Sequence, residues 1–225
     1  MKNPFLVSFS GLDGSGKTQL IILLRRFLRR QGIHYLYIHT VRDSFDNRLA
    51  KKYPVLKAVA ESKEENSSTQ KVNKVKKIGL FSFYLRVLAI FCYGLSLRFR
   101  MISLVKEYQV IIFDRYVFDK LVNLAYLRGK ENCWLTSLLV KIFPKIDLPI
   151  YLHVRPEQSL ERKKEVIEES QDLEYFQIKY ELFEKEKQGW KMITVDNSLL
   201  TLSEVKKKVL SLFKKRFYRK QKNSF

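Results

Sequence analysis

Eight residues near the amino terminus, Gly11 to Thr18, have the spacing G-x-x-x-x-G-K-[ST] of a Walker A phosphate-binding loop. The apolar run Phe5 to Phe9 precedes them and predicts a buried strand, while a helical apolar pattern follows them and ends at Gly32. Glycines let backbone N–H groups turn toward phosphate oxygens, and the positive end of the next helix favours the same charge. We therefore expect Lys17 to contact the β- and γ-phosphates of a nucleoside triphosphate and Thr18 to hold Mg²⁺. The other expected nucleotide-binding residues are Gly11, Asp13, Gly14, Ser15 and Gly16.

A second chemical motif is the apolar run Val110 to Phe113, which ends in Asp114 and Arg115. A buried strand that ends in aspartate places a carboxylate beside the phosphate loop, where it can hold Mg²⁺ directly or through water. The adjacent arginine can offer two parallel hydrogen bonds to a phosphate. An Asp-Arg pair at a strand end can also be a structural salt bridge or a turn. The Walker A loop upstream favours the catalytic interpretation for Lys17, Asp114 and Arg115.

Strand and helix patterns alternate along the rest of the chain, as a parallel α/β sheet requires. We expect one three-layer P-loop NTPase fold, with five parallel strands, helices on both faces and the active site outside the carboxyl ends of the strands. Strands are predicted at Phe5–Ser10, His34–Thr40, Gln109–Asp114, Leu148–Val154 and Lys191–Val195. Helices are predicted at Tyr116–Arg128, Cys133–Phe143, from Pro156, at Asp172–Gln188, and from Thr201, where Thr201 and Glu204 form a capping-box pattern.

The stretch Ile78 to Leu97 is long enough to cross a bilayer and carries Arg86 as its single charge. The residues on either side of it are predicted to supply strands of one sheet, which argues against a span. We interpret it as a long core helix, or as a helix that buries its apolar face against a second subunit. Peripheral membrane contact, assisted by the basic residues Lys71 to Lys77 and by Arg98 and Arg100, stays open.

Composition limits the class of protein. The 225 residues are 46% hydrophobic, which favours one core, and two cysteines suit neither a disulfide framework nor a metal site. The sequence after Met1 leaves no room for a secretory signal, so we expect a cytoplasmic protein. With 43 Lys and Arg against 23 Asp and Glu, the net charge of +20 favours polyanionic partners without choosing among them. Nucleic acid is not expected as the primary partner, because stacking and zinc signatures are lacking. We expect the enzymatic domain at 1–213 and a basic tail at 214–225.

Taken together, these motifs resemble the thymidylate kinases, a family of P-loop nucleoside-monophosphate kinases. The resemblance runs in order along most of the chain and is carried by Phe9–Thr18 and by the D-R-Y motif Asp114–Tyr116. Asp147–Glu157 and Ile193–Asp196 are similar to the fourth and fifth strands of that family. The resemblance implies that Asp13 touches the sugar hydroxyl of the acceptor, and that Arg115 contacts the acceptor phosphate.

The same resemblance predicts three further groups of site residues. Arg42 occupies the place of a family arginine that grips the acceptor phosphate, although the proline and glycines around it are missing. Asn123 is the candidate polar contact to the base, and Arg86, Arg98 and Arg100 compete for the role of base-reading arginine. The phosphate loop has no arginine at its variable positions, so a lid near 160–172 should supply a cation. The candidates are Arg162, Lys163 and Lys164, which could equally form an exposed helix surface.

The function that the resemblance implies is transfer of the ATP γ-phosphoryl group, assisted by Mg²⁺, to dTMP or a related nucleoside monophosphate in nucleotide biosynthesis. A homodimer is implied as well, with the helix at 78–105 suited to the dimer face that thymidylate kinases use. Two alternatives remain at this point. One is a kinase of the same fold acting on another small acceptor, possibly at a membrane, and the other is a nucleotide-dependent binding protein.

Overall fold

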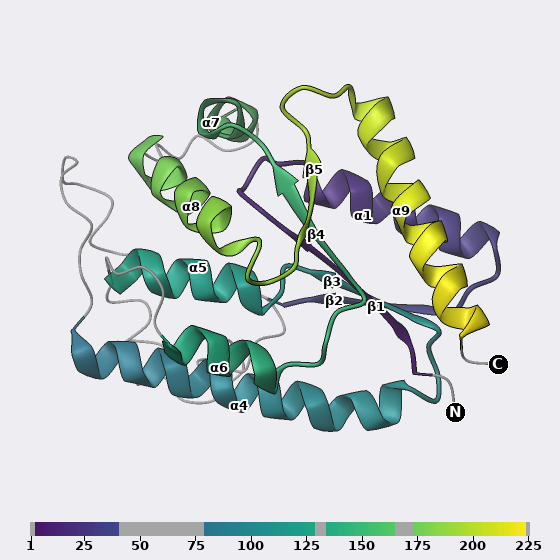
Figure 1. Ribbon diagram of the computed structural model, residues 1–225, viewed down its shortest axis with the longest axis horizontal. Coiled ribbons are helices and arrows are strands. Elements are labelled where there is room, and N and C mark those ends of the chain that lie inside the picture. The colour runs from purple at the N-terminus through teal and green to yellow at the C-terminus, as the bar shows by residue number, and fades with distance from the viewer. Residues whose placement is uncertain (1–2, 41–78, 129–133, 165–172, 224–225) are drawn as a thin grey trace.

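The computed structural model describes residues 3–40, 79–128, 134–164 and 173–223 (Figure 1). Within them, five parallel strands form one sheet in the order β2-β3-β1-β4-β5. Strand β1 therefore lies at the centre, between β3 and β4. This confirms the predicted fold class. The strands are β1 (Phe5–Ser10), β2 (Tyr35–His39), β3 (Val110–Asp114), β4 (Leu148–His153) and β5 (Ile193–Asp196).

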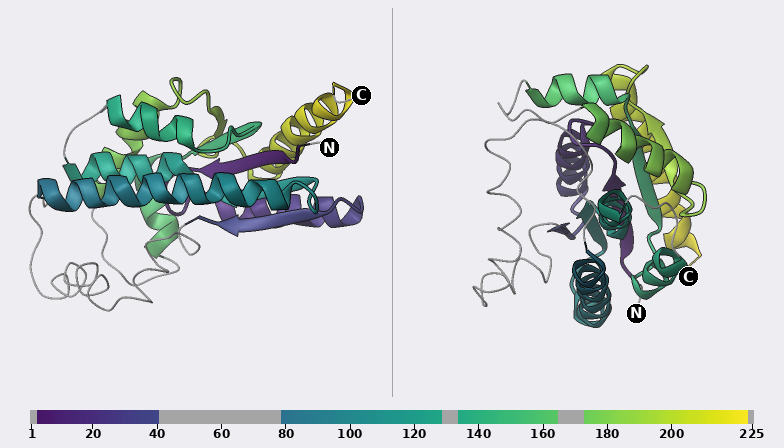
Figure 2. Two further views of the ribbon diagram at one scale, coloured as in Figure 1. Left: turned by 90° about the horizontal axis from the view of Figure 1, so that it is seen from below. Right: turned by 90° about the vertical axis from the view of Figure 1, so that its left-hand side faces the viewer.

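Helices cover both faces of the sheet (Figures 1 and 2). Side chains alternate along β1: Phe5, Val7 and Phe9 enter the core shared with α1 and α9, whereas Leu6 enters the core shared with α4, α5 and α6. Helices α7 and α8 lie beyond the carboxyl ends of β4 and β5 (Figure 1). The helices are α1 (Lys17–Arg30), α4 (Leu80–Leu104), α5 (Val117–Arg128), α6 (Trp134–Ile142), α7 (Pro156–Lys164), α8 (Leu173–Glu186) and α9 (Leu202–Lys222).

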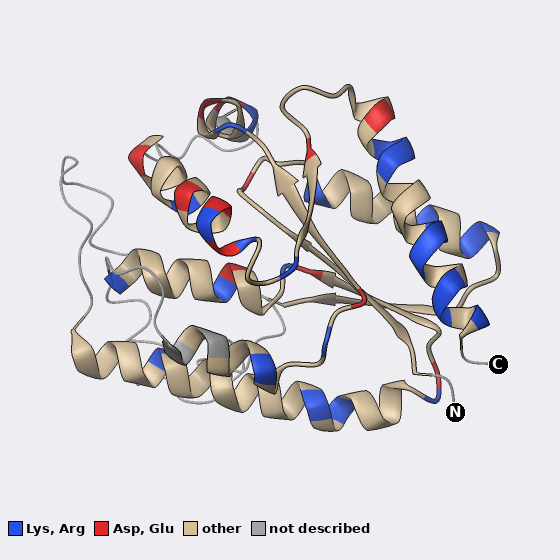
Figure 3. Ribbon diagram, in the orientation of Figure 1, with Lys and Arg blue, Asp and Glu red and all other residues tan. Residues whose placement is uncertain are grey.

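Helix α9 begins with the predicted capping box. The backbone N–H of Glu204 donates to Thr201 Oγ1 at 3.3 Å, and the Glu204 carboxylate accepts from the backbone N–H of Thr201 at 2.8 Å. The helix then continues to Lys222, so residues 214–222 differ from the expected basic tail. The physical reason is the four-residue spacing of the apolar side chains, which keeps Phe213 and Phe217 buried against Phe5. Lysines and arginines are distributed along the helix (Figure 3), and none of them is buried.

Helix α4 has two apolar faces. One packs on the sheet and on α6, where Gly94 allows close approach because a Cβ there would lie 2.8 Å from the Phe143 ring. One face of α4 contributes to the core, but only 28% of the residues in its most apolar window are buried. Burial of the other face against a second subunit stays a prediction. Among the described residues, α4 is the one helix long and apolar enough to cross a membrane. The strands β2 and β3, before and after it in the chain, pair in one sheet, which a single crossing by α4 would prevent. Exposed apolar side chains on α4 are Leu80, Phe81, Tyr84, Leu85, Leu88, Phe91, Leu95, Phe99 and Ile102.

Candidate active site

The phosphate loop joins the end of β1 to the start of α1 and is enclosed by β4 and α7. Gly11 and Gly14 have φ angles of 138° and 80°, which side-chain-bearing residues rarely adopt. A Cβ at Gly11 would lie 2.6 Å from the carbonyl oxygen of Leu152, and a Cβ at Gly14 would lie 2.5 Å from that of Ser159. These glycines are therefore required both by backbone conformation and by the close packing of β4 and α7.

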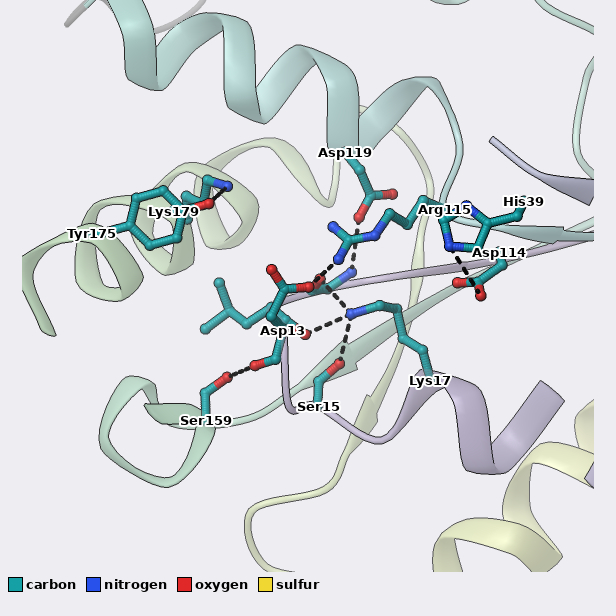
Figure 4. Close-up of polar contacts among 12 residues, drawn as sticks. Asp13, Ser15, Lys17, His39, Asp114, Arg115, Asp119, Ser159, Tyr175 and Lys179 are labelled. Carbon is teal, nitrogen blue, oxygen red and sulfur yellow. Dashed lines mark hydrogen bonds and ion pairs between the residues drawn. The ribbon is translucent and has the colours of Figure 1, made fainter. Parts of the chain in front are cut away.

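Lys17 opens α1 and is buried. Its ammonium donates to the carbonyl oxygens of Gly11 at 2.9 Å and Leu12 at 2.6 Å, so it points back into the loop (Figure 4). Burial, together with the nearby charge of Arg115, lowers the pKa of Lys17 to about 8 against the opposing effect of Asp13. Phosphate oxygens bound in the loop would stabilise the charged form of this lysine.

Asp114 lies beside the loop because β1 and β3 are paired in the register Phe9 to Asp114. Its Oδ2 accepts from the Tyr37 hydroxyl at 2.8 Å and lies 3.9 Å from His39 Nε2. The Thr18 side chain is exposed in the first turn of α1. Within the described ranges no three His, Cys, Asp or Glu residues cluster as a metal site. One carboxylate and one hydroxyl nevertheless fit Mg²⁺, because this ion takes oxygen ligands and usually keeps waters and substrate phosphates among them.

Arg115 has a left-handed backbone, with φ of 63°, which costs energy in a residue that bears a side chain. Its conformation is held from both sides: its N–H donates to Phe9 O at 3.0 Å, and its carbonyl accepts from Thr40 Oγ1 at 2.5 Å. The guanidinium pairs with the Asp13 carboxylate over the phosphate loop (Figure 4). Burial alone would raise the pKa of Asp13, but Arg115, Lys17 and Lys179 outweigh it and lower that pKa. Strain at this position is typical of residues that serve a functional site.

Two buried residues that the sequence analysis did not assign to the site support the loop. Asp119 accepts from the backbone N–H groups of Gly11 at 3.4 Å and Tyr116 at 3.1 Å, joining the start of α5 to the loop. Asn197, just after β5, donates from its side chain to the carbonyl of Ser15 at 2.8 Å. Their positions in the sequence could have indicated this role. Asp119 lies in the first turn of a predicted helix, and Asn197 follows a predicted strand at the same edge of the sheet as the loop.

A pocket lies between the phosphate loop, α5 and α8, and it brings together three of the predicted acceptor residues: Asp13, Arg115 and Asn123. Four residues of α8 also line it, and the polar ones, Tyr175 and Lys179, were not predicted as site residues. The full lining is Gly11, Leu12, Asp13, Arg115, Asp119, Val122, Asn123, Tyr175, Phe176, Lys179 and Phe183.

Of the remaining predicted site residues, the structure describes some and leaves others outside the described ranges. Arg42 and residues 165–172 of the expected lid lie outside the described residues. The α7 residue Arg162 donates to the carbonyl of Asn197 at 3.2 Å and its Cβ is close to Gly14, so it borders the phosphate loop. Lys163 and Lys164 belong to the same helix, but their side chains lie outside the described residues.

The three arginines that compete to read the base lie along α4. Arg98 lines a cavity with Asp147 and Pro149 at the start of β4, which is the edge of the sheet opposite the phosphate loop. Arg100 lies still closer to the end of α4, from which the chain enters β3. Arg86 is nearer the beginning of that helix, and the choice among the three arginines stays a prediction.

A parallel sheet of this order, with a phosphate loop after its central strand and an Asp-Arg pair after the neighbouring strand, defines a P-loop phosphotransferase. The sequence model of one such family, described as thymidylate kinase, matches residues 9–209. The chain belongs to the thymidylate kinase family, whose members are ATP-dependent nucleoside-monophosphate kinases.

Similar proteins carry the same description at modest identity. The probable thymidylate kinase of Sulfolobus acidocaldarius is 26% identical over 215 residues, which cover 94% of this chain and 84% of the relative. That of Archaeoglobus fulgidus is 26% identical over 159 residues, covering 70% and 68%. The thymidylate kinase of Thermoanaerobacter sp. is 25% identical over 171 residues, covering 72% and 71%. The chain therefore matches more than two thirds of each of these proteins.

Proposed function

We propose that this chain transfers the γ-phosphoryl group of ATP to dTMP, forming ADP and dTDP. The observation that supports this most directly is the Asp13–Arg115 pair, which extends from the donor loop into the adjoining pocket. Lys17, at the base of the loop, belongs to the donor side, and Asn123, on α5, belongs to the acceptor side. Family membership favours this reaction over another small acceptor or a binding role.

The donor site consists of the loop glycines, Ser15 and Lys17. Thr18 and Asp114 would hold Mg²⁺, which when bound neutralises charge on the β- and γ-phosphates. The chain's own contribution is positioning and charge, because phosphoryl transfer through a loose transition state needs little covalent chemistry from the protein. As the bond to the γ-phosphorus breaks, negative charge develops on the β–γ bridging oxygen. The role of Lys17 is to stabilise that charge.

The acceptor side is assigned to residues around the pocket. Asp13 would accept a hydrogen bond from the sugar hydroxyl, and Asn123 would contact the base. Arg115 would exchange part of its pairing with Asp13 for the acceptor phosphate, and Arg42 would approach the same phosphate from the segment after β2. Arg162, already beside Gly14, would supply the cation that the phosphate loop itself lacks, with Lys163 and Lys164 as its neighbours on α7.

The exposed face of α4 is assigned to a second copy of the chain. Its apolar stripe runs from Phe81 to Ile102, a length of about 32 Å at 1.5 Å per residue. Stripes of this size on soluble proteins mark interaction surfaces. A Leu88→Glu variant should therefore be monomeric by light scattering where the wild type is dimeric. A wild type that is monomeric and sediments with anionic vesicles would instead favour the membrane interpretation, and with it a site of action at the membrane rather than free in the cytoplasm.

The reaction is tested by coupled ADP release with ATP, Mg²⁺ and a panel of dTMP, dUMP, UMP, CMP, AMP and GMP. Turnover should be strongest with dTMP and should be lost in Lys17→Ala. Preserved ATP binding without turnover on any of these monophosphates would overturn the proposal.

A further inference from the structure

Lys179 is a buried cation in the acceptor pocket. It lies on the inner face of α8 with 8% of its surface exposed, between Phe176 and Phe183 along the pocket wall. Its ammonium donates a hydrogen bond to the hydroxyl of Tyr175, one helical turn earlier, and lies 4.1 Å from the centre of that ring (Figure 4). Burial raises the pKa of Tyr175 to about 12, so its partner is a neutral phenol rather than an anion.

The carboxylates that face Lys179 are already engaged by other groups. Asp13 on the phosphate loop pairs with Arg115, and Asp119 on α5 accepts from the backbone of Gly11 and Tyr116. Within the described ranges Lys179 forms no ion pair, and its one hydrogen bond to protein is the bond to Tyr175. An ammonium carries three donors, so two of them have no acceptor among the described protein groups.

The surroundings of this ammonium are unfavourable without an anion. Burial, together with the like charges of Arg115 and Lys17, lowers the pKa of Lys179 to about 8 against the opposing effect of Asp13 and Asp119. A buried charge that lacks a partner costs stability, whereas an apolar residue would fill the same place on α8 without that cost. The ammonium and the Arg115 guanidinium border one pocket and repel each other, an arrangement that an anion between them would stabilise.

We propose that Lys179 binds a phosphate oxygen of the monophosphate acceptor, sharing that phosphate with Arg115. This assignment rests on the proposed function and adds to it a residue from α8 that recognises the negative charge of the acceptor phosphate. The phosphate would provide acceptors for the two unused ammonium donors and would separate the two cations by a dianion.

The test compares dTMP binding to the wild type, Lys179→Met, Lys179→Arg and Lys185→Met, the last being an exposed lysine on the same helix. Loss of a charge-assisted hydrogen bond should weaken binding in Lys179→Met by about ten- to a hundredfold. Lys179→Arg should recover part of that loss, and Lys185→Met should bind as the wild type does. Thymidine, which has no phosphate, should bind Lys179→Met and the wild type alike. An equal loss for thymidine and dTMP would place the contact at the sugar and overturn the proposal.

Calorimetry in buffers of different ionisation enthalpy supplies a readout that a purely structural role would not change. A site with a pKa near 8 is about 0.8 deprotonated at pH 8.5, so wild type should take up as much as about 0.8 of a proton when dTMP raises that pKa. Lys179→Met should take up correspondingly less, and because Lys17 is present in both proteins, the difference isolates Lys179. Equal uptake would refute the assignment, as would a Lys179→Met protein that is markedly less stable than the wild type. If the wild type neither binds nor phosphorylates dTMP, the proposed function itself fails, and this assignment fails with it.

Discussion

Replacing Gly14 by alanine tests whether the shape of the phosphate loop depends on its contact with α7. The new Cβ would lie 2.5 Å from Ser159 O, and the residue would have to keep φ near 80°. A left-handed conformation costs an alanine about 1–2 kcal/mol. This contact is too short to persist. The atom that the new Cβ would approach belongs to the backbone of α7, so no flexible side chain can rotate away to relieve it. The loop and the helix must therefore separate, by an amount on the order of 1 Å.

A displacement of that size is large for phosphoryl transfer. Misplacing reacting groups by about 1 Å can reduce a rate by about a hundredfold, equivalent to about 2.7 kcal/mol in the activation free energy. We therefore expect kcat/KM for ATP to fall about a hundredfold in Gly14→Ala, measured by coupled ADP release at saturating acceptor.

Two other glycines provide matched controls for this variant. Gly32 has φ of 65° with nothing within 4 Å of its added Cβ, so Gly32→Ala should lower stability by about 1 kcal/mol and leave kcat/KM unchanged. Gly79 has an ordinary φ of −61° and also has open space around it, so Gly79→Ala should leave kcat/KM unchanged. Activity in Gly14→Ala within threefold of wild type would refute the argument, as would an equal loss of activity in Gly32→Ala.

Three further predictions concern stability. Phe217→Ala should lower the free energy of unfolding, measured in urea, by about 3–5 kcal/mol. The control Tyr218→Ala changes an exposed neighbour and should alter this free energy little. Equal effects would mean that the residues after 213 are not packed against the core as part of α9. Thr201→Ala removes the capping hydroxyl and should cost about 1 kcal/mol, or about 2–4 °C in Tm by calorimetry, and an unchanged Tm would argue against the capping box. The pKa of Lys179 is near 8 in the folded protein, below the 10.5 of the unfolded chain. Between pH 8 and pH 10.5 the unfolded state therefore binds more protons than the folded state. The stability of the wild type should accordingly rise with pH over this interval. The free energy of unfolding of Lys179→Met should exceed that of the wild type, and this difference should shrink by at most about 1.4 kcal/mol per pH unit from pH 8 to 10.5. A difference in urea midpoints that stays constant with pH would contradict the predicted direction of the change.

The sheet could be predicted because its three central strands, β1, β3 and β4, are largely apolar runs buried on both faces. Strand β1 coincides with the predicted Phe5–Ser10, and the others differ by one or two residues at their ends, where pairing rather than composition decides the limit. The extent of α9 was underestimated, because a run rich in lysine and arginine hides the four-residue spacing of Phe213 and Phe217. For helix α4 the sequence left a core helix and a helix packed against a second subunit as alternatives, because apolar content does not show which of two apolar faces has a partner in the same chain.

The site was predictable where one short motif carries several functional residues, as in the phosphate loop and in Asp114–Arg115. Tyr37, Asn197 and Lys179 were missed for a different reason. Each reaches the site from a segment distant in sequence, and none belongs to a short motif that marks it as a site residue. Their roles follow from strand register and from the packing of α8 on α5, which depend on tertiary structure.

The enclosure of the phosphate loop has a consequence for nucleotide affinity. The Ser159 hydroxyl donates to the carbonyl of Asp13, and Asn197 donates to that of Ser15, so protein contacts alone hold the loop in its curved form. The loop is thus preorganised, and the entropy of ordering it is lost when the chain folds rather than when ATP arrives. Amide hydrogens of the loop should therefore exchange slowly in the nucleotide-free protein. Removal of the Ser159 hydroxyl should weaken ATP binding even though that hydroxyl contacts the protein and not the nucleotide.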